Sequence, residues 1–276
     1  MVLASDLATA LDPVLLMKRS LGMTPDAWQE EALRSSAPRI LLNCCRQSGK
    51  SLVAGLLAVH AAVYEPGAPV LLLSRSLRQS QELFRTALMV YRALDEPVPM
   101  EAESALRLEL ANGSRIISLP GKEATVRGFA GVRFLIIDEA ARVPDDLYFT
   151  VRPMLAVSGG RLMALSTPWG RRGWWWRAWG SEEAWLRFEV RATECPRISP
   201  EFLAEERAAL GDWWYRQEYE CAFEDNTYQV FPTELVMRAF SEDIPVLFEG
   251  VGAPVGGLDA DVEPLFLPSP PEEEDL

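Results

Sequence analysis

The sequence has very few of the side chains that usually build metal sites or disulfides. His60 is the only histidine in 276 residues, and the cysteines are Cys44, Cys45, Cys195 and Cys221. These cysteines form no Cys-x-x-Cys pair and have no histidine at ligand spacing, so the sequence argues against a zinc site. Cysteines without a disulfide framework are typical of a reducing compartment, and we expect a cytoplasmic protein.

Long apolar runs are also lacking. The longest charge-free apolar stretch near the middle of the chain, residues 51–64, is shorter than the ~20 residues that a membrane helix needs. The N-terminal stretch contains Asp6 and Asp12 and has no cationic start, which differs from a signal peptide. We therefore expect neither a membrane span nor a membrane partner.

Basic residues are absent from the C-terminal stretch. Residues 241–276 hold ten of the 40 acids and none of the 27 lysines and arginines, and the net charge of the chain is −13. The remainder is nearly balanced, so a polyanionic partner such as DNA is not excluded. Proline, glycine and acids dominate from Pro245 onward, which predicts a disordered acidic tail.

Short apolar runs alternate with longer amphipathic ones, the pattern of a parallel sheet flanked by helices in the α/β class. Asn112-Gly113 is a strong hairpin signal between two further apolar runs. The predicted strands are 40–42, 70–74, 105–110, 115–119, 134–137, 162–165 and 186–190, and the predicted helices are 51–64, 77–94 and stretches within 200–221.

The character of the chain changes after Pro168, where tryptophans crowd one segment and helical stretches follow. We interpret residues 1–170 as the core, 171–240 as a small helical lid or linker subdomain, and 241–276 as the acidic tail. The tryptophans favour packing in a core or hinge, and stacking on bases is the alternative.

A phosphate-binding loop is predicted where Arg46 to Ser51 follow a strand and open a helix. Backbone N–H groups around Gln47, Ser48 and Gly49 would bind a polyphosphate, Lys50 would neutralise its outer phosphates, and the Ser51 hydroxyl would ligate Mg²⁺. The motif departs from its usual form at Cys44, which replaces the first glycine. We therefore expect a P-loop NTPase fold of the ASCE type with ATP and Mg²⁺ as ligands.

Two adjacent acids, Asp138 and Glu139, follow a buried strand, and open α/β sheets bind ligands at such strand ends. Asp138 would hold Mg²⁺, and Glu139 would polarise the water that attacks the γ-phosphate. The alternative is a helix N-cap followed by an acid in the first helical turn.

Two other positions carry weaker signals. Ser166 and Thr167 end another apolar strand, and their hydroxyls could sense the γ-phosphate, although Ser-Thr-Pro is also an ordinary strand-ending turn. Trp28 and Gln29 precede the first strand and could offer a ring and an amide to a base, although Trp28 could equally lie in the core.

Taken in order, several segments between residues 24 and 240 resemble the ATPase domain of phage large terminase subunits, the motors that package DNA into procapsids. The segments are Thr24-Pro25-Asp26-Ala27-Trp28-Gln29, Cys45-Arg46-Gln47-Ser48-Gly49-Lys50-Ser51, Ser74-Arg75-Ser76-Leu77-Arg78-Gln79-Ser80, Val126-Arg127-Gly128, Leu135-Ile136-Ile137-Asp138-Glu139-Ala140 and Ser166-Thr167-Pro168-Trp169-Gly170.

This resemblance implies a Mg²⁺-dependent ATPase that forms a ring, usually a pentamer, on the portal protein and moves double-stranded DNA, with a small terminase subunit as a further partner. It implies that Gln29 contacts adenine, that Arg46 is a phosphate-loop arginine, and that Ser166 and Thr167 couple hydrolysis to motion. Because neighbours in ring ATPases often supply an arginine to the transition state, Arg127 is a candidate to act across subunits, while Arg46 could act within its own subunit. The alternatives for Arg127 are a solvated loop arginine or a contact to DNA phosphate.

The resemblance weakens at the C-terminus, where family members usually continue into an RNase H-like nuclease. The segment Gly256-Gly257-Leu258-Asp259 is faintly similar to the first strand of such a domain, but no further metal-binding acid can be placed on a strand. We expect no nuclease activity from this chain, so either a separate nuclease cuts the DNA or the chain is a relic.

Two other functions are compatible with these motifs. One is a helicase-like or other P-loop DNA-dependent ATPase outside packaging, and the other is a nucleotide-gated binding module or prophage relic that does not hydrolyse ATP. The intact Lys50, Ser51, Asp138 and Glu139 favour a working ATPase over the relic.

Overall fold

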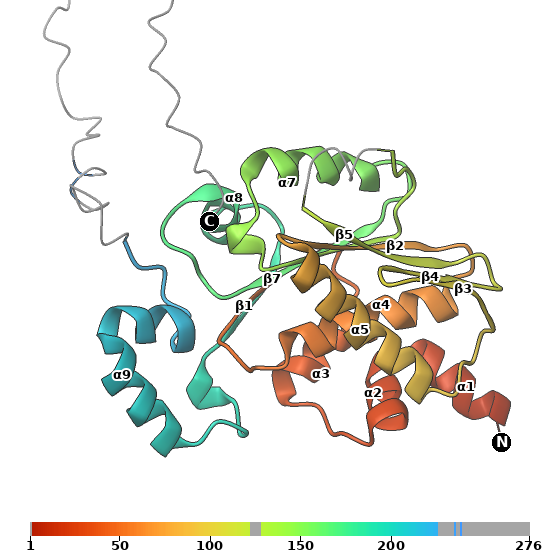
Figure 1. Ribbon diagram of the computed structural model, residues 1–276, viewed down its shortest axis with the longest axis horizontal. Coiled ribbons are helices and arrows are strands. Elements are labelled where there is room, and N and C mark those ends of the chain that lie inside the picture. Colours follow the sequence, from red (N-terminus) through yellow and green to blue (C-terminus); the bar gives the residue numbers. More distant parts are fainter. Residues whose placement is uncertain (1, 122–127, 226–234, 236–237, 239–276) are drawn as a thin grey trace, which may run out of the picture. The chain divides into compact units, whose positions relative to one another are not determined.

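The computed structural model of the protein describes residues 2–121, 128–225, 235 and 238. Among these residues, eight strands form one sheet with helices on both of its faces (Figure 1). The sheet and its helices all belong to the compact unit Met1–Pro232.

The strands are β1 (Arg39–Cys44), β2 (Pro69–Ser74), β3 (Met100–Glu103), β4 (Arg107–Leu110), β5 (Arg115–Pro120), β6 (Phe134–Asp138), β7 (Arg161–Ser166) and β8 (Leu186–Val190). The helices are α1 (Val2–Leu11), α2 (Pro13–Leu21), α3 (Ala27–Arg34), α4 (Lys50–Tyr64), α5 (Leu77–Ala93), α7 (Asp145–Val151), α8 (Gly173–Gly180) and α9 (Pro200–Tyr219). The 3₁₀ turns are η1 (Ala140–Arg142), η2 (Arg152–Leu155) and η3 (Ala192–Glu194).

The strand order is β3-β4-β5-β2-β6-β7-β1-β8. The six strands from β5 to β8 in this order pair in parallel, whereas β3, β4 and β5 pair antiparallel. Strand β7 therefore lies between β1, which leads into the phosphate loop, and β6, which ends at Asp138. The ends of these three strands meet at one edge of the sheet.

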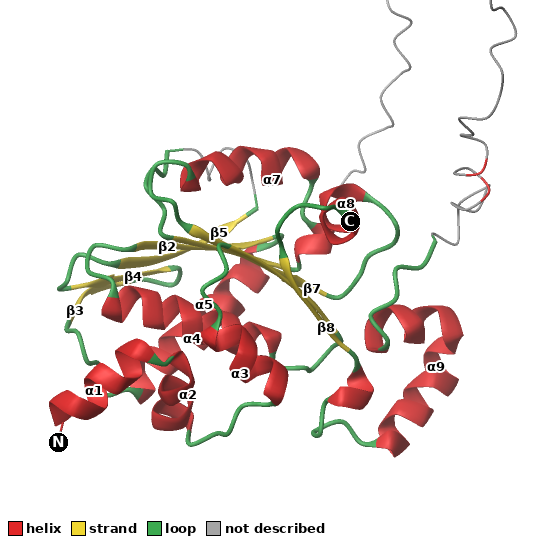
Figure 2. Ribbon diagram, turned by 180° about the vertical axis from the view of Figure 1, so that it is seen from behind, coloured by secondary structure: helices red, strands yellow, loops and turns green. Residues whose placement is uncertain are grey.

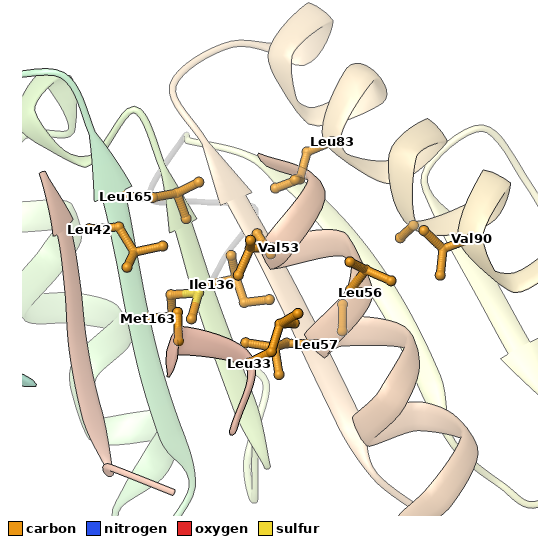
Figure 3. Packing of buried hydrophobic residues seen from close by; sticks show 14 of the residues in the cluster. Leu33, Leu42, Val53, Leu56, Leu57, Leu83, Val90, Ile136, Met163 and Leu165 are labelled. Atoms are coloured by element: carbon orange, nitrogen blue, oxygen red, sulfur yellow. The ribbon is translucent and has the colours of Figure 1, made fainter. Parts of the chain in front are cut away.

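Alternate residues of the central strands fill two apolar layers, as the two-residue period of a strand requires. Leu42 and Ile136 pack with α2 to α5 on one face, where the sheet meets the long helix α4 (Figure 3). Leu41 and Leu135 belong to the second apolar layer and pack with residues of α7 and α8, the helices that lie on the other side of the sheet (Figure 2). Burial on both faces explains why these strands are almost entirely apolar.

The fold class is confirmed, and each predicted strand or helix differs from the observed element by no more than two residues at either end. The hairpin is confirmed, with Leu108 opposite Ile116 and Gly113 in the left-handed region at φ +80°. Strand β8, which falls inside the predicted 171–240 subdomain, pairs with β1 and so belongs to the central sheet. The division at residues 170 and 240 stays a prediction, and the predicted tail at 241–276 lies outside the described residues.

Several observed elements have no counterpart in the sequence-based prediction. Strand β3 is an edge strand with mostly exposed side chains, so it lacks the apolar alternation that marks a strand. Helices α1, α2, α3 and α7 contain ten residues or fewer, and short helices depend on tertiary packing rather than on their own periodicity.

Two of the four tryptophans of α8, Trp174 and Trp175, lie in the core, the position that their sequence context favoured. The Trp174 ring stacks on Tyr148 with centroids 3.9 Å apart, and its Nε1 donates to the Val143 carbonyl oxygen at 3.0 Å. Trp175 is 1% exposed. In the described part of the chain, we find no helix with the length and apolarity that crossing a membrane requires.

We predict that Leu42→Ala lowers the free energy of unfolding by about 3 kcal/mol, because it removes buried methyl groups and leaves a cavity. Leu11→Ala is the matched control, since Leu11 is 78% exposed whereas Leu42 is fully buried, and it should change stability by less than ~0.5 kcal/mol. Urea unfolding of both variants checks this, and equal effects would contradict the packing described above.

Candidate nucleotide-binding site

The phosphate loop connects β1 to α4 and turns without a glycine at its first position. Cys44 still belongs to β1, and the Cys45 N–H donates to the Val190 carbonyl oxygen of β8 at 2.9 Å. The left-handed residues of the loop are Gln47 at φ +59° and Gly49 at φ +91°. The departure at Cys44 is therefore accommodated by extending the strand and turning later in the loop.

Gly49 is required at its position for two reasons. Its φ suits glycine, and a Cβ there would lie 2.6 Å from Gln29 Nε2. Gln29 is 1% exposed, donates from Nε2 to the Ser48 carbonyl oxygen at 3.4 Å, and accepts from the Asp26 N–H at 3.0 Å. Gln29 thus supports the loop and is not among the residues that line the adjoining cavity.

A cavity of about 510 Å³ lies beside the loop. Four of its lining side chains are cationic and one is a carboxylate, a balance that suits a polyphosphate. The structure brings together five predicted site residues here, Arg46, Gln47, Gly49, Lys50 and Ser51, with Glu139 from the end of β6. The remaining lining residues are Leu52, Arg75, Gln79 and Arg142.

Asp138 is buried beside this cavity and carries an altered pKa. It is 8% exposed, and one of its carboxylate oxygens accepts the Glu139 N–H at 3.0 Å. Burial, aided by the neighbouring Glu139 carboxylate, raises the pKa of Asp138 to about 6, while Lys50 opposes the rise. A cation bound beside Asp138 would offset both the burial of its carboxylate and its repulsion by the Glu139 carboxylate.

Glu139 lies in the left-handed region at φ +50°, which is uncommon for a residue with a side chain. Such backbone strain persists where the surrounding structure holds it and is concentrated at functional sites. The Glu139 carboxylate lies 3.9 Å from Arg142 Nε. The Arg142 guanidinium in turn stacks on Trp169, with its carbon 3.9 Å from the ring centroid.

Ser166 ends β7 and Thr167 follows it, both in the interior of the protein, at 0% and 2% exposure. Ser166 is paired with Asn43 of β1, while Leu165 is paired with Asp138 of β6. Among the residues that the structure describes, the Ser166 hydroxyl has no hydrogen-bond partner. These hydroxyls therefore lie between the strand of the phosphate loop and the strand of the acid pair.

A second cavity of about 390 Å³ shares Arg46 and Arg142 with the first, and its other lining residues are Trp169, Glu206, Leu210, Trp214, Glu218 and Tyr219. Arg46 Nε donates to Glu218 Oε2 at 2.7 Å, and this hydrogen bond raises the pKa of Arg46 further above its usual value. Arg46 thus lies at the border of the two cavities.

Several polar residues that line these cavities were not predicted as site residues. Arg75 directly follows β2, and Gln79 lies in the first turn of α5, so the rule that ligands bind at the carboxyl ends of parallel strands could have found both. Arg142 lies three residues after Glu139, within reach of its carboxylate. Glu218 has no such signal. The predicted Arg127 lies outside the described residues.

A mainly parallel sheet with a phosphate loop between β1 and α4 defines the class of P-loop NTPases. The family model described as "Terminase large subunit, T4likevirus-type, N-terminal" matches residues 41–238. The chain belongs to this family.

Individual relatives agree with this assignment. The large terminase subunit of Thermus phage G20c is 26% identical over 76% of this chain and 51% of its own length, and that of Escherichia phage T5 is 26% identical over 77% and 51%. The chain thus spans about half the length of the curated relatives it matches. The large terminase ATPase domain of Thermus phage P74-26 superposes with a TM-score of 0.66 at 25% identity, covering 77% of this chain and 99% of that domain.

We predict that Asp138→Asn stabilises the protein at pH 7 when chelator is present and nucleotide is absent. An acid whose pKa is raised from 3.8 to about 6 in the folded state costs stability above that range and costs none below it. Removing the charge should raise the free energy of unfolding by about 2 kcal/mol at pH 7. The gap from the unsubstituted protein should shrink as the pH falls toward 4. Urea unfolding at several pH values measures it, and a constant gap would show that the raised pKa is wrong.

Proposed function

We propose that this chain is the ATPase part of a DNA-packaging motor, which hydrolyses ATP and uses the energy to move double-stranded viral DNA into a procapsid. The observation that carries the proposal is one cavity lined by the phosphate loop and Glu139 in a chain of the large terminase family. The likeness to an ATPase domain of that family supports the same activity.

The residues around the cavity have distinct roles in this proposal. The N–H groups of Gln47, Ser48 and Gly49 bind phosphate oxygens, and Lys50 neutralises the outer phosphates. Glu139 accepts a proton from the attacking water. Arg46, which lines the cavity, would stabilise the charge that develops on the γ-phosphate.

The site also fits Mg²⁺. Ser51 lines the cavity and Asp138 is buried beside it, and hydroxyl and carboxylate oxygens are the donors that this ion prefers. We propose that Ser51 and Asp138 hold it, directly or through water. When bound, Mg²⁺ neutralises phosphate charge and orients the transferring group.

Ser166 and Thr167 are proposed to couple hydrolysis to motion. They lie at the end of β7, between β1 and β6. A shift of the phosphate loop after β1 or of the acid pair after β6 would therefore change their surroundings. We propose that residues 171–240 act as the lid or linker that transmits this movement, and that Gln29 contacts the adenine of ATP.

The partners of this function are also proposals. The chain would assemble as a ring, usually of five copies, on the portal protein in the host cytoplasm, and receive double-stranded DNA with a small terminase subunit. DNA-stimulated ATP turnover without strand separation would distinguish this function from that of a helicase, and capture of the portal protein would support it directly.

We predict that Lys50→Ala weakens binding of Mg²⁺ and ATP by about tenfold or more, because a charge-assisted contact to phosphate is lost. Glu139→Gln should still bind ATP but turn it over roughly 10²- to 10⁴-fold more slowly, the usual contribution of a general base. Lys18→Ala, which removes an exposed lysine on α2, is the matched control. Calorimetry and phosphate release test these effects. ATP affinity that is the same with and without Lys50 would refute the nucleotide site.

We predict that Arg127 acts across subunits in the assembled ring. An arginine finger accelerates phosphoryl transfer by roughly 10³ to 10⁵, so Arg127→Ala should be nearly inactive. In rings mixed from Arg127→Ala and Glu139→Gln subunits, some junctions pair an intact site with an intact arginine. ATP turnover should then exceed the sum of the two separate variants. If assembled mixed rings recover no turnover, Arg127 does not act in trans and Arg46 is the remaining candidate.

A further inference from the structure

Three hydrogen bonds join the last turn of α9 and Cys221, just after it, to Arg46 of the phosphate loop and Asn43 of β1. The Arg46 N–H donates to the Glu218 carbonyl oxygen at 3.1 Å, and Arg46 Nε donates to Glu218 Oε2 at 2.7 Å. Asn43 Nδ2 donates to the Cys221 carbonyl oxygen at 3.1 Å. Glu218 therefore holds both the backbone and the side chain of Arg46, although the two residues are 172 positions apart.

The two partners of this ion pair differ strongly in burial. The Glu218 side chain is 7% exposed, whereas the Arg46 side chain is 60% exposed. A buried carboxylate is costly unless a cation accompanies it, while an exposed guanidinium can leave with little penalty. The carboxylate therefore needs a partner more than the arginine does.

Arg142 supplies a second partner to the same carboxylate. Arg142 Nη2 lies 3.7 Å from Glu218 Oε1, the oxygen that Arg46 does not use. Stacking on Trp169 holds the Arg142 guanidinium in place. If Arg46 moves away, Glu218 keeps a cation beside it. The pair is thus arranged so that Arg46 can be released without stranding a buried charge.

Arg46 lines the nucleotide cavity as well as the cavity that contains Glu218. Both a carboxylate and a terminal phosphate match the planar fork of a guanidinium. We propose that Glu218 is a positioning residue that holds Arg46 at rest and competes with the γ-phosphate for it, so that Glu218 sets how well the site discriminates between nucleoside triphosphate and diphosphate. This inference rests on the proposed function of the site.

The exchange also has a consequence for α9. When the γ-phosphate binds the Arg46 side chain, the hydrogen bond from Arg46 Nε to Glu218 Oε2 is lost. Nucleoside diphosphate has no γ-phosphate, so it leaves the bond intact. The helix end thereby responds to the γ-phosphate and not to nucleotide in general.

Glu218→Gln tests the proposal in the full chain. The substitution keeps the size of the side chain but removes the charge that competes for Arg46. Calorimetry with Mg²⁺ should show that a non-hydrolysable ATP analogue binds roughly tenfold more tightly relative to ADP than in the unsubstituted protein, the ratio that corresponds to ~1.4 kcal/mol. Glu206→Gln is the matched control, because Glu206 lines the same cavity and bonds the Tyr219 hydroxyl. It should leave the ratio unchanged.

Two further variants sharpen the result. In an Arg46→Ala background, Glu218→Gln should no longer change the ratio, since the arginine that it releases is gone. Glu218→Asp keeps a negative charge in this region, but its shorter side chain lengthens the distance to Arg46. It should therefore shift the ratio in the same direction. This variant provides the test if Glu218→Gln does not fold.

The possible outcomes distinguish a wrong role for Glu218 from a wrong assignment of the nucleotide site. An unchanged ratio, or equal weakening of both nucleotides, would overturn the positioning role of Glu218 while leaving the nucleotide site intact. A shift that persists in the Arg46→Ala background would also overturn it. Failure of the unsubstituted protein to bind either nucleotide would overturn the proposed function and this inference together.

Discussion

The parallel pairing of β1, β7 and β6 is the constraint on which the site depends. Because the three strands run in the same direction and in fixed register, Asn43 lies beside Ser166, and Leu165 lies beside Asp138. The segments that follow these strands must then meet at one edge of the sheet. A single slip of register would turn each of these side chains to the opposite face. The buried apolar layers on both faces prevent such a slip and so determine where the polar residues lie.

Two features of the site lower the stability of the protein when no ligand is bound. Asp138 is buried and its pKa is raised, and Glu139 adopts a backbone conformation that side chains disfavour. Both features cost free energy in the protein without ligand. Their common benefit is preorganisation, because a cation and a polyphosphate would meet charges that are already in place. The surplus of cationic side chains around the cavity points to the same class of ligand.

The segment after β8 connects this edge of the sheet to α9. Arg197 donates to the Ser48 carbonyl oxygen at 3.0 Å and pairs with Asp26, while Glu218 holds Arg46. Two residues of the phosphate loop, Arg46 and Ser48, are thus hydrogen-bonded to residues far along the chain. A loop fastened in this way can pass a local change in charge to distant elements, since its contacts are discrete bonds that form or break.

The sequence by itself determined the succession of the long helices and the apolar strands, the phosphate loop and the acid pair. Each of these signals is carried by contiguous residues, either as a two- or 3.6-residue period or as a short motif such as Arg46 to Ser51. The edge strand β3 carries no such period, and the N-terminal helices are too short for their period to predict a helix, so packing decided these elements. Tertiary structure alone also decided that Gln29 supports the loop, and that Arg142 and Glu218 stand beside Arg46. Contacts between separate segments of the chain depend on how the sheet brings loops together, and that is a property of the folded chain.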